Sequence, residues 1–413
     1  MLSAAAMASA GACAAEPPAE IELSIATFGQ FGYDNLYPEY EYQHPGIKIT
    51  PIRTEQGGPY HQELRTELRT GTRLADIQAV EEGHLPEVLT MASQLEDLAK
   101  IGPPEVRPDR WLPWKYEAGR AKDGKLVGYG TDSGPLAMCY RRDLLDQAGM
   151  PVDDESVRAM FATWDSYFAA GERYVKRTRG KAWFDSAAAN FTAMVNQLDV
   201  GYFDRQNQPT LATNTALKTS WDKVTDAVAH GESAGLTALA DDGNNGLRQS
   251  TFATKVCPAW MLGVIENQAG SGVTGRWAVI DAFPEGGGNW GGSYLTVPVK
   301  SKHPKEAAEL AAWLTAPEQQ LTAFKVSGNF PSQVAALESP DLLSQTNAYF
   351  GGLVVGEIFV NQARKVGAPQ YKGPGDGEIQ ESVTAPALKA VEQGTAASDA
   401  WRQVVDGVRK LVR

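Results

Sequence analysis

The sequence is poor in the residues and patterns from which several common kinds of site are built. It has three cysteines and five histidines among 413 residues, and no histidine stands at a metal-ligand spacing from a cysteine, so we expect no metal site. After residue 15 no apolar run approaches the roughly 20 residues that a membrane-spanning helix requires. The phosphate-binding pattern GxxxxGK[ST] is absent, which assigns any ATP hydrolysis to a partner.

Clusters of positive charge are also missing. The chain carries 38 Lys and Arg against 50 Asp and Glu, a net charge of -12, and no basic cluster is interleaved with aromatic residues. Nucleic acid and anionic membrane surfaces are therefore disfavoured as partners, whereas a neutral ligand is compatible with this balance. With 43% hydrophobic and 21% charged residues, the composition is that of a globular protein, and the length suggests about two or three domains.

The first thirteen residues, MLSAAAMASAGAC, are small and apolar and give way to the polar spacer AAEPPAE. This pattern is typical of a targeting segment rather than of a fold element. The stretch AGAC resembles the lipobox of bacterial lipoproteins, whose cysteine becomes the acylated first residue after cleavage. The resemblance predicts a signal segment over 1–13, lipidation of Cys13, a linker over 14–20 and a position on the extracellular face of the cytoplasmic membrane. An ordinary cleaved signal, giving a secreted protein, or a disordered tail is the alternative.

Two other cysteines, Cys139 and Cys257, remain. They either form one disulfide in an oxidising compartment or stay as two buried thiols. Their spacing in the sequence does not decide between these alternatives, because it says nothing about their separation in space.

Apolar periodicity predicts that strands and helices alternate from residue 21 onwards. IELSIATF (21–28) alternates as a strand, the next segment carries Leu36 and Tyr40 as a helix, and a second strand covers 47–52. A second helix follows and has Gly71 as its expected C-cap. Such alternation is typical of α/β lobes, which bind ligands at the carboxyl ends of their strands.

Four segments occur in an order that characterises one family. They are LSIATFGQFGY, YHQELRTELRTGTRLADIQAVEEGHLPEVL, LVGYGTDSGPLAMCYRRDLLDQAGM and GGSYLTVPVKSKHPKEAAELAAWLTAPEQQLTAFKVSGNFPS. With these segments the chain resembles the extracellular solute-binding proteins of bacterial ABC sugar importers. It is most similar to the actinobacterial cellobiose- and cello-oligosaccharide-binding lipoproteins, which share the FGY loop, the AVEEG stretch and the KGPGDGEIQ loop.

This resemblance implies a non-enzymatic, monomeric protein without a cofactor that captures an oligosaccharide, cellobiose or a cello-oligosaccharide, and delivers it to the permease subunits of an ABC importer. The implied fold is α/β and periplasmic-binding-protein-like, with two lobes, a ligand cleft between them and crossovers near 133–139, 293–298 and 335–345. The implied lobes are 21–134 with 298–338 (lobe I) and 135–297 with 339–413 (lobe II).

A neutral oligosaccharide offers apolar ring faces and a fringe of hydroxyl groups, so its cleft needs flat aromatic rings and compact polar side chains. The sequence places both kinds in loops and at the predicted crossovers. The candidate ligand-binding residues are Phe28, Gln30, Phe31, Glu81, Glu82, Asp132, Ser133, Trp183, Trp260, Trp290, Gly291, Gly292, Asn329, Lys372 and Asp376. For Glu81 and Glu82 the alternative is a solvated acidic pair at a helix start, and for the KGPGDGE loop it is a loop without ligand contacts.

The stretch GGGNWGGSYL (286–295) places a tryptophan among glycines. We expect Trp290 to be only partly buried and to carry a sugar ring, because glycines leave its face open and let backbone groups approach hydroxyls. The alternative is a surface turn whose tryptophan packs against a neighbouring lobe. Trp260 and Trp183 are each divided between a sugar platform and core packing.

Two other functions use the same residue types. Acidic residues near aromatic rings also serve glycoside hydrolases, but nothing in the sequence marks a carboxyl pair held about 5 to 9.5 Å apart, the range which that chemistry requires. Exposed aromatic loops would equally suit an extracellular interaction module. The family resemblance favours binding without turnover.

Overall fold

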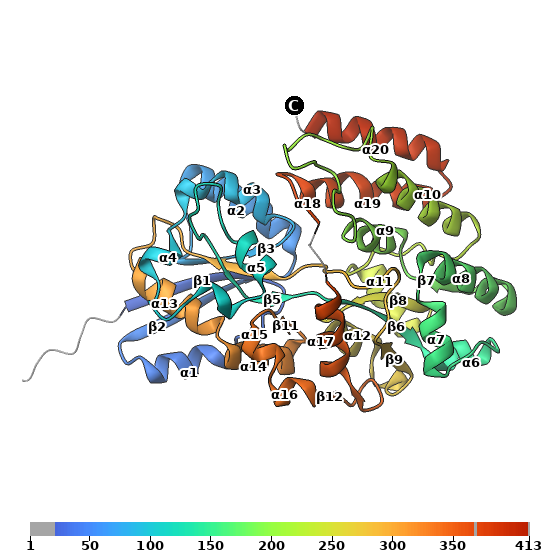
Figure 1. The fold of residues 1–413 in the computed structure, drawn as a ribbon, viewed down its shortest axis with the longest axis horizontal. Coiled ribbons are helices and arrows are strands. Elements are labelled where there is room, and N and C mark those ends of the chain that lie inside the picture. Colours follow the sequence, from blue (N-terminus) through green and yellow to red (C-terminus); the bar gives the residue numbers. More distant parts are fainter. Residues whose placement is uncertain (1–20, 367–369, 412–413) are drawn as a thin grey trace, which may run out of the picture.

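The computed structural model describes residues 21–366 and 370–411. It has the predicted fold class: two α/β lobes stand side by side, each built around its own sheet (Figure 1). The predicted signal segment, its Cys13 and the linker lie outside the described residues. Within the described part of the chain, no helix is long and apolar enough to cross a membrane.

The sheet of lobe I has five strands in the order β2-β1-β3-β10-β4. Its strands are β1 (Ile21–Phe28), β2 (Ile47–Thr54), β3 (Ile77–Glu81), β4 (Tyr129–Gly130) and β10 (Ser293–Thr296). Its helices are α1 (Leu36–Gln43), α2 (Gly57–Thr70), α3 (Leu85–Thr90), α4 (Leu98–Ile101), α5 (Pro113–Ala118), α13 (Pro304–Leu314), α14 (Pro317–Ser327) and α15 (Val334–Leu337). Because β1 is parallel to β3, Phe28 and Glu81 at their carboxyl ends reach the same edge of the sheet.

Lobe II has a four-stranded sheet in the order β7-β8-β6-β9. Its strands are β6 (Leu136–Arg141), β7 (Ala182–Phe184), β8 (Phe252–Pro258) and β9 (Trp277–Ile280), and a short hairpin joins β12 (Thr346–Asn347) to β13 (Leu353–Val354). Its helices are α6 (Arg142–Gln147), α7 (Asp154–Met160), α8 (Trp164–Thr178), α9 (Ala187–Val195), α10 (Thr215–Ala229), α11 (Asp241–Gln249), α12 (Met261–Ala269), α16 (Pro340–Leu343), α17 (Val355–Lys365), α18 (Asp376–Ile379), α19 (Ala385–Glu392) and α20 (Ala397–Leu411). In Figure 1 the last helix, α20, lies beside α10 and α19 at the outer end of this lobe.

The local patterns of the first lobe fold as their periodicity predicts. The first strand and the helix that carries Leu36 and Tyr40 are present, and both side chains are buried. Gly71 caps the C-terminus of α2 in the left-handed conformation, with φ of 66°, which glycine adopts without the penalty that a Cβ imposes. These elements hold the loops that follow β1 and β3 against the second lobe.

One predicted crossover is misplaced. The prediction assigned residues up to 297 to lobe II, but β10 pairs with β3 and β4 in the sheet of lobe I. The chain therefore returns to lobe I before Ser293, at residues 289–292, where Asn289 bridges to Pro135 of the first crossing. The pattern SYLT is strand-like wherever it lies, so periodicity alone did not show which sheet it joins. The third crossing follows the short pair of β5 (Asp132–Ser133) with β11 (Phe330–Pro331).

The two cysteines left undecided by the sequence form a disulfide. Cys139 on β6 and Cys257 on β8 are bonded, with their Cα atoms 5.5 Å apart, and both are fully buried. The bond joins neighbouring antiparallel strands that are 118 residues apart in the chain, so it fixes the centre of the lobe II sheet.

Candidate functional site

The predicted acidic pair lies where lobe I, the second crossing and lobe II meet. Glu82 follows β3, and its backbone N–H donates to the Gly292 carbonyl at 2.9 Å. Its Oε2 accepts a hydrogen bond from Asn289 Nδ2 at 2.6 Å, and its Oε1 lies 3.2 Å from Lys372 Nζ of lobe II. Glu82 and Lys372, 290 positions apart in the printed sequence, are thus brought together as the prediction required, but mainly as partners of each other.

Glu81 differs from its neighbour because it keeps part of its carboxylate open. Its Oε2 accepts from the Gly83 N–H at 2.6 Å, and its own N–H donates to His61 Nε2 at 3.0 Å. Burial raises its pKa, although Lys372 and His84 oppose that shift. The other oxygen faces the second crossing, since a Cβ built on Gly291 would lie 3.7 Å from Glu81 Oε1. Glu81 is therefore the acidic side chain best placed to accept from a ligand hydroxyl.

Trp260 and Trp290 form an aromatic pair beside this carboxylate. Their ring centroids are 6.1 Å apart at an interplanar angle of 86°, and Trp260 Nε1 donates to the Trp290 carbonyl at 3.0 Å. Both side chains are partly buried, which agrees with the expectation for Trp290. The pair offers two perpendicular apolar faces, the kind of surface on which sugar rings lie.

The glycines near Trp290 are required by close contacts between backbone segments. This is a stronger constraint than the open ring face that the sequence predicted. A Cβ on Gly134 would lie 1.9 Å from the Trp290 carbonyl oxygen, and one on Gly292 would lie 2.5 Å from that of Asp132. Gly291 and Gly292 also have φ of 84° and 101°, where side chains are disfavoured. These glycines let the first and second crossings pack backbone against backbone, and the neighbouring rings depend on that packing for their position.

The predicted residues after β1 form the rim of lobe I. Phe28 packs edge-on against Phe31 with ring centroids 5.3 Å apart, and Asn329 Nδ2 donates to the Gln30 carbonyl at 2.8 Å. Phe31, Asn329 and Asp132 line a hollow of about 10 Å³, which is room for about one water molecule. All the residues that line it belong to lobe I, so the hollow lies within the rim of that lobe.

Asp132 and Ser133 lie in the hinge. Asp132 Oδ1 accepts from the Ser293 N–H at 2.9 Å, and burial raises its pKa against the opposing effect of Lys115. Ser133 is 1% exposed and donates its hydroxyl to the Pro331 carbonyl at 3.1 Å. The prediction of Ser133 as a ligand contact is wrong for this arrangement, because the hydroxyl is buried in the β5–β11 pair.

Lys372 and Asp376 come from the KGPGDGE loop, which reaches lobe I. Burial disfavours the charge on Lys372, but Glu82, Glu81 and Asp376 outweigh that effect and raise its pKa. Asp376 closes its own loop by accepting from the Gly373 N–H at 2.9 Å, and burial raises its pKa to about 7. Asp376 therefore shapes the loop that presents Lys372.

The prediction that Trp183 contacts the ligand is wrong. It is fully buried in the core of lobe II, against Tyr167 at 5.6 Å and Tyr174 at 5.4 Å between ring centroids. The polar neighbours in KAWFDS suggested an exposed loop, but Trp183 lies on strand β7, which is buried along its whole length. It packs the core and does not face the cleft.

Two residues of the cleft region were missed by the sequence reasoning. Asn289 joins the first crossing to Glu82, because its Oδ1 accepts from the Gly134 N–H at 2.8 Å. Lys115 on α5 is fully buried, with its Nζ 4.0 Å from the Tyr294 ring centroid and no hydrogen-bond partner among the residues that the structure describes. Burial lowers its pKa, opposed by Glu82 and Asp132. A polar residue inside the glycine run was the available signal for Asn289, whereas no local pattern marks Lys115.

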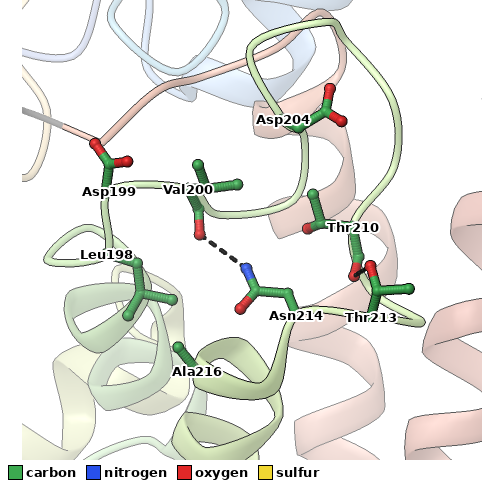
Figure 2. Close-up of a pocket in the computed structure, with 8 residues that line it drawn as sticks. All are labelled: Leu198, Asp199, Val200, Asp204, Thr210, Thr213, Asn214 and Ala216. Carbon is green, nitrogen blue, oxygen red and sulfur yellow. Dashed lines mark hydrogen bonds between the residues drawn. The ribbon is translucent and has the colours of Figure 1, made fainter.

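A larger hollow lies on lobe II, away from the predicted residues. It has a volume of about 430 Å³ and is bordered by the loop from Leu198 to Asn214 and the start of α10 (Figure 2). Asn214 Nδ2 donates to the Val200 carbonyl at 2.9 Å and its Oδ1 accepts from the Leu217 N–H at 3.1 Å. The amide serves as the helix cap, so this hollow is a surface depression formed by loop packing.

Comparison with known proteins agrees with this geometry. Residues 35–349 match the family described as bacterial extracellular solute-binding protein. The arabinooligosaccharide-binding protein of Bacillus subtilis (strain 168) is 28% identical over 322 residues, which cover 73% of this chain and 70% of that protein. A crystal structure of an extracellular solute-binding protein family 1 member is 46% identical, with a TM-score of 0.86 and coverage of 95% and 100%.

A third similarity concerns the fold alone. The ABC transporter associated binding protein from B. animalis subsp. lactis Bl-04, solved with beta-1,6-galactobiose, is 19% identical with a TM-score of 0.80, and the match covers 95% of this chain and 97% of that one. Two α/β lobes with aromatic rings and carboxylates gathered where they meet define a two-lobed binding protein. The chain belongs to the family of bacterial extracellular solute-binding proteins.

The family membership settles the class of activity. Its members are binding proteins rather than enzymes, and this chain is a binding protein that acts outside the cytoplasmic membrane. Among the residues that the structure describes, no group of three or more His, Cys, Asp or Glu side chains is arranged to hold a metal ion.

Proposed function

We propose that this protein captures a neutral oligosaccharide between its lobes and delivers it to the permease subunits of an ABC importer. The observation that carries the proposal is the Trp260–Trp290 pair beside the partly open Glu81 carboxylate. Apolar ring faces of a sugar stack on such indoles, and its hydroxyls donate to carboxylates. A similar protein that is described as arabinooligosaccharide-binding supports the class of ligand.

Within that class we propose cellobiose and short cello-oligosaccharides. The support is the combination of the FGY loop, the AVEEG stretch and the KGPGDGEIQ loop, which resembles the cello-oligosaccharide binders. The first segment supplies Phe31 on the rim of lobe I, the second supplies Glu81 and Glu82 after β3, and the third supplies Lys372, which pairs with Glu82 across the lobes.

Calorimetric titration with a sugar panel tests the ligand. The panel contains cellobiose, cellotriose, an arabino-oligosaccharide, maltose and beta-1,6-galactobiose. We expect micromolar or tighter binding of the β-linked glucose oligomers, which corresponds to about 8 kcal/mol, and intact sugar on chromatography after long incubation. Tighter binding of the arabino-oligosaccharide would contradict the cello-oligosaccharide assignment but would still support an oligosaccharide as the ligand. If no sugar binds, the proposal that the ligand is an oligosaccharide is wrong.

We also propose that the mature protein is a monomer anchored by a lipid on Cys13. The small apolar run that ends at this cysteine and is followed by a polar linker supports the anchor. Radiolabelled fatty acid should enter the wild type and be lost in Cys13→Ala. Equal labelling of both proteins would contradict the anchor, and a dimer in sedimentation would contradict the monomer.

A further inference from the structure

Helix α2 and the loop that follows β3, both in lobe I, touch the segment 372–381 of lobe II through several contacts. Gly377 N–H donates to the Gly83 carbonyl at 3.2 Å. The charged contacts are Glu82 Oε1 with Lys372 Nζ at 3.2 Å, His84 Nε2 with Glu381 Oε1 at 3.3 Å, and Arg65 Nη2 with Glu378 Oε2 at 3.6 Å. Each contact joins one lobe to the other, so each exists only while the lobes are together.

The Glu82–Lys372 contact differs from the other two in burial. The side chains of Glu82 and Lys372 are 8% and 13% exposed, so both partners are buried. In the other two pairs His84 and Arg65 are buried, but Glu381 and Glu378 are 47% and 37% exposed, so solvent screens these pairs more strongly. We therefore expect the Glu82–Lys372 pair to have the largest effect of charge on closure.

Both oxygens of Glu82 already have a donor. Asn289, which also accepts from Gly134, holds Oε2 from the crossing, while Lys372 approaches Oε1 from lobe II. The backbone N–H of Glu82 is bound to Gly292 as well. The carboxylate is thus fixed from the hinge side and presented to a cation on the opposite lobe, rather than left open to a hydroxyl as in Glu81.

We propose that Glu82 and Lys372 form an ion pair, the interlobe clasp, that sets the arrangement of the two lobes when the cleft is closed. Asn289 orients Glu82, and neither Glu82 nor Lys372 is a primary sugar contact. This inference rests on the proposed function for the sugar that drives closure. The pair gains its ion contact only by losing water from both groups, and these two effects nearly balance in a buried pair. The clasp therefore fixes how the lobes close and leaves the empty protein only partly closed.

Replacing one residue of the Glu82–Lys372 pair should weaken sugar binding more than replacing both. Lys372→Met leaves the Glu82 carboxylate buried without its cation in the closed state, and Glu82→Gln does the reverse for Lys372. We expect each single variant to bind the sugar about 10- to 100-fold more weakly, and the double variant to be much less impaired than the product of the two losses. Two independent hydroxyl contacts would instead give multiplying losses, which would overturn the proposal.

The interlobe distance gives a readout that does not depend on the sugar. Spin labels at Tyr42→Cys of lobe I and Leu239→Cys of lobe II occupy exposed positions, 87% and 57% exposed, and pulsed electron paramagnetic resonance measures their separation. In Lys372→Met we expect a smaller closed fraction than in the wild type, with and without sugar, while the melting temperature of the unliganded protein stays unchanged. The control Lys218→Met removes a lysine that pairs with Asp222 inside α10 and should change neither quantity.

The outcomes separate this inference from the proposed function. If the wild type binds none of the sugars, the proposed function fails, and the closed fraction of the unliganded proteins still decides the clasp. If unliganded Lys372→Met has the same closed fraction as the unliganded wild type and differs only in affinity, Lys372 is a sugar contact and the clasp is wrong. A lowered melting temperature with an unchanged closed fraction would also reject it, because that result describes a merely structural pair.

Discussion

At the scale of single residues, Trp290 and Trp183 show how surroundings decide what a tryptophan does. Trp290 is partly buried among glycines, whereas Trp183 is fully buried among aromatic rings of lobe II. A sugar ring on Trp290 would cover about 50 to 100 Å² of apolar surface, which is worth about 1 to 2.5 kcal/mol at ~25 cal/mol per Å². We expect Trp290→Ala to weaken sugar binding by about 6- to 70-fold and to leave the melting temperature nearly unchanged, as calorimetry and a thermal melt will show.

Trp183 supplies the matched control for that variant. Loss of a core tryptophan costs about 3 to 5 kcal/mol of stability, so the milder Trp183→Phe should lower the melting temperature and leave the affinity of the folded protein unchanged. If Trp290→Ala instead melts early while its folded fraction binds normally, Trp290 is structural and the ligand assignment at this residue fails.

Glu232 is a second residue whose burial has a measurable consequence. It is 1% exposed, its Oε2 has no hydrogen-bond partner among the described residues, and burial raises its pKa to about 8. Because the folded state holds this proton more tightly than the unfolded state, the stability contributed by the group is complete below pH of about 4.5. It falls by ~1.4 kcal/mol for each pH unit up to about 8.

We expect one substitution, Glu232→Gln, to flatten the dependence of the free energy of unfolding on pH. Glu232→Gln should lose this part of the slope and be more stable than the wild type at pH 8, whereas the two should differ little near pH 4.5. Urea unfolding at several pH values measures the difference. Parallel profiles of wild type and variant would show that Glu232 ionises normally in the folded protein.

At the scale of elements, the crossings depend on glycine more than on any side chain. A Cβ on Gly134 would meet the Trp290 carbonyl at 1.9 Å, while one on Gly272, in the short 3-10 helix that follows α12, would meet nothing within 4 Å. We expect Gly134→Ala to cost about 1 to 3 kcal/mol through overpacking and to weaken sugar binding, because it displaces the backbone that carries Trp290. Gly272→Ala should be neutral in denaturant unfolding and in titration. Equal behaviour of the two variants would contradict the close approach of the crossings.

The same scale explains what could be predicted from the sequence. The strand 21–28, the helix with Leu36 and the cap at Gly71 depend on neighbours within a few residues, so periodicity identified them. The position of β10 and the burial of Trp183 depend on partners far away in the chain, so both were misassigned. Asn289 and Glu82 are separated by 207 positions, and no local sequence pattern predicts their contact.

At the scale of the whole molecule, the arrangement favours a ligand that closes the lobes. The contacts of Glu82, His84 and Gly377 span the lobes. A sugar that touches Trp290 and Glu81 from both sides gains its full set of contacts only in the shut form, so it must stabilise that form. The disulfide and the two sheets keep each lobe rigid during this motion.

The central claim is that an oligosaccharide binds between the lobes and closes them, and small-angle X-ray scattering tests it most directly. The radius of gyration of the wild type is measured without sugar and with saturating cellotriose, in samples where calorimetry has established saturation. We expect a smaller radius of gyration in the presence of the sugar. An unchanged radius of gyration with demonstrated binding would contradict it, because the sugar would then occupy a site that does not depend on the approach of the two lobes.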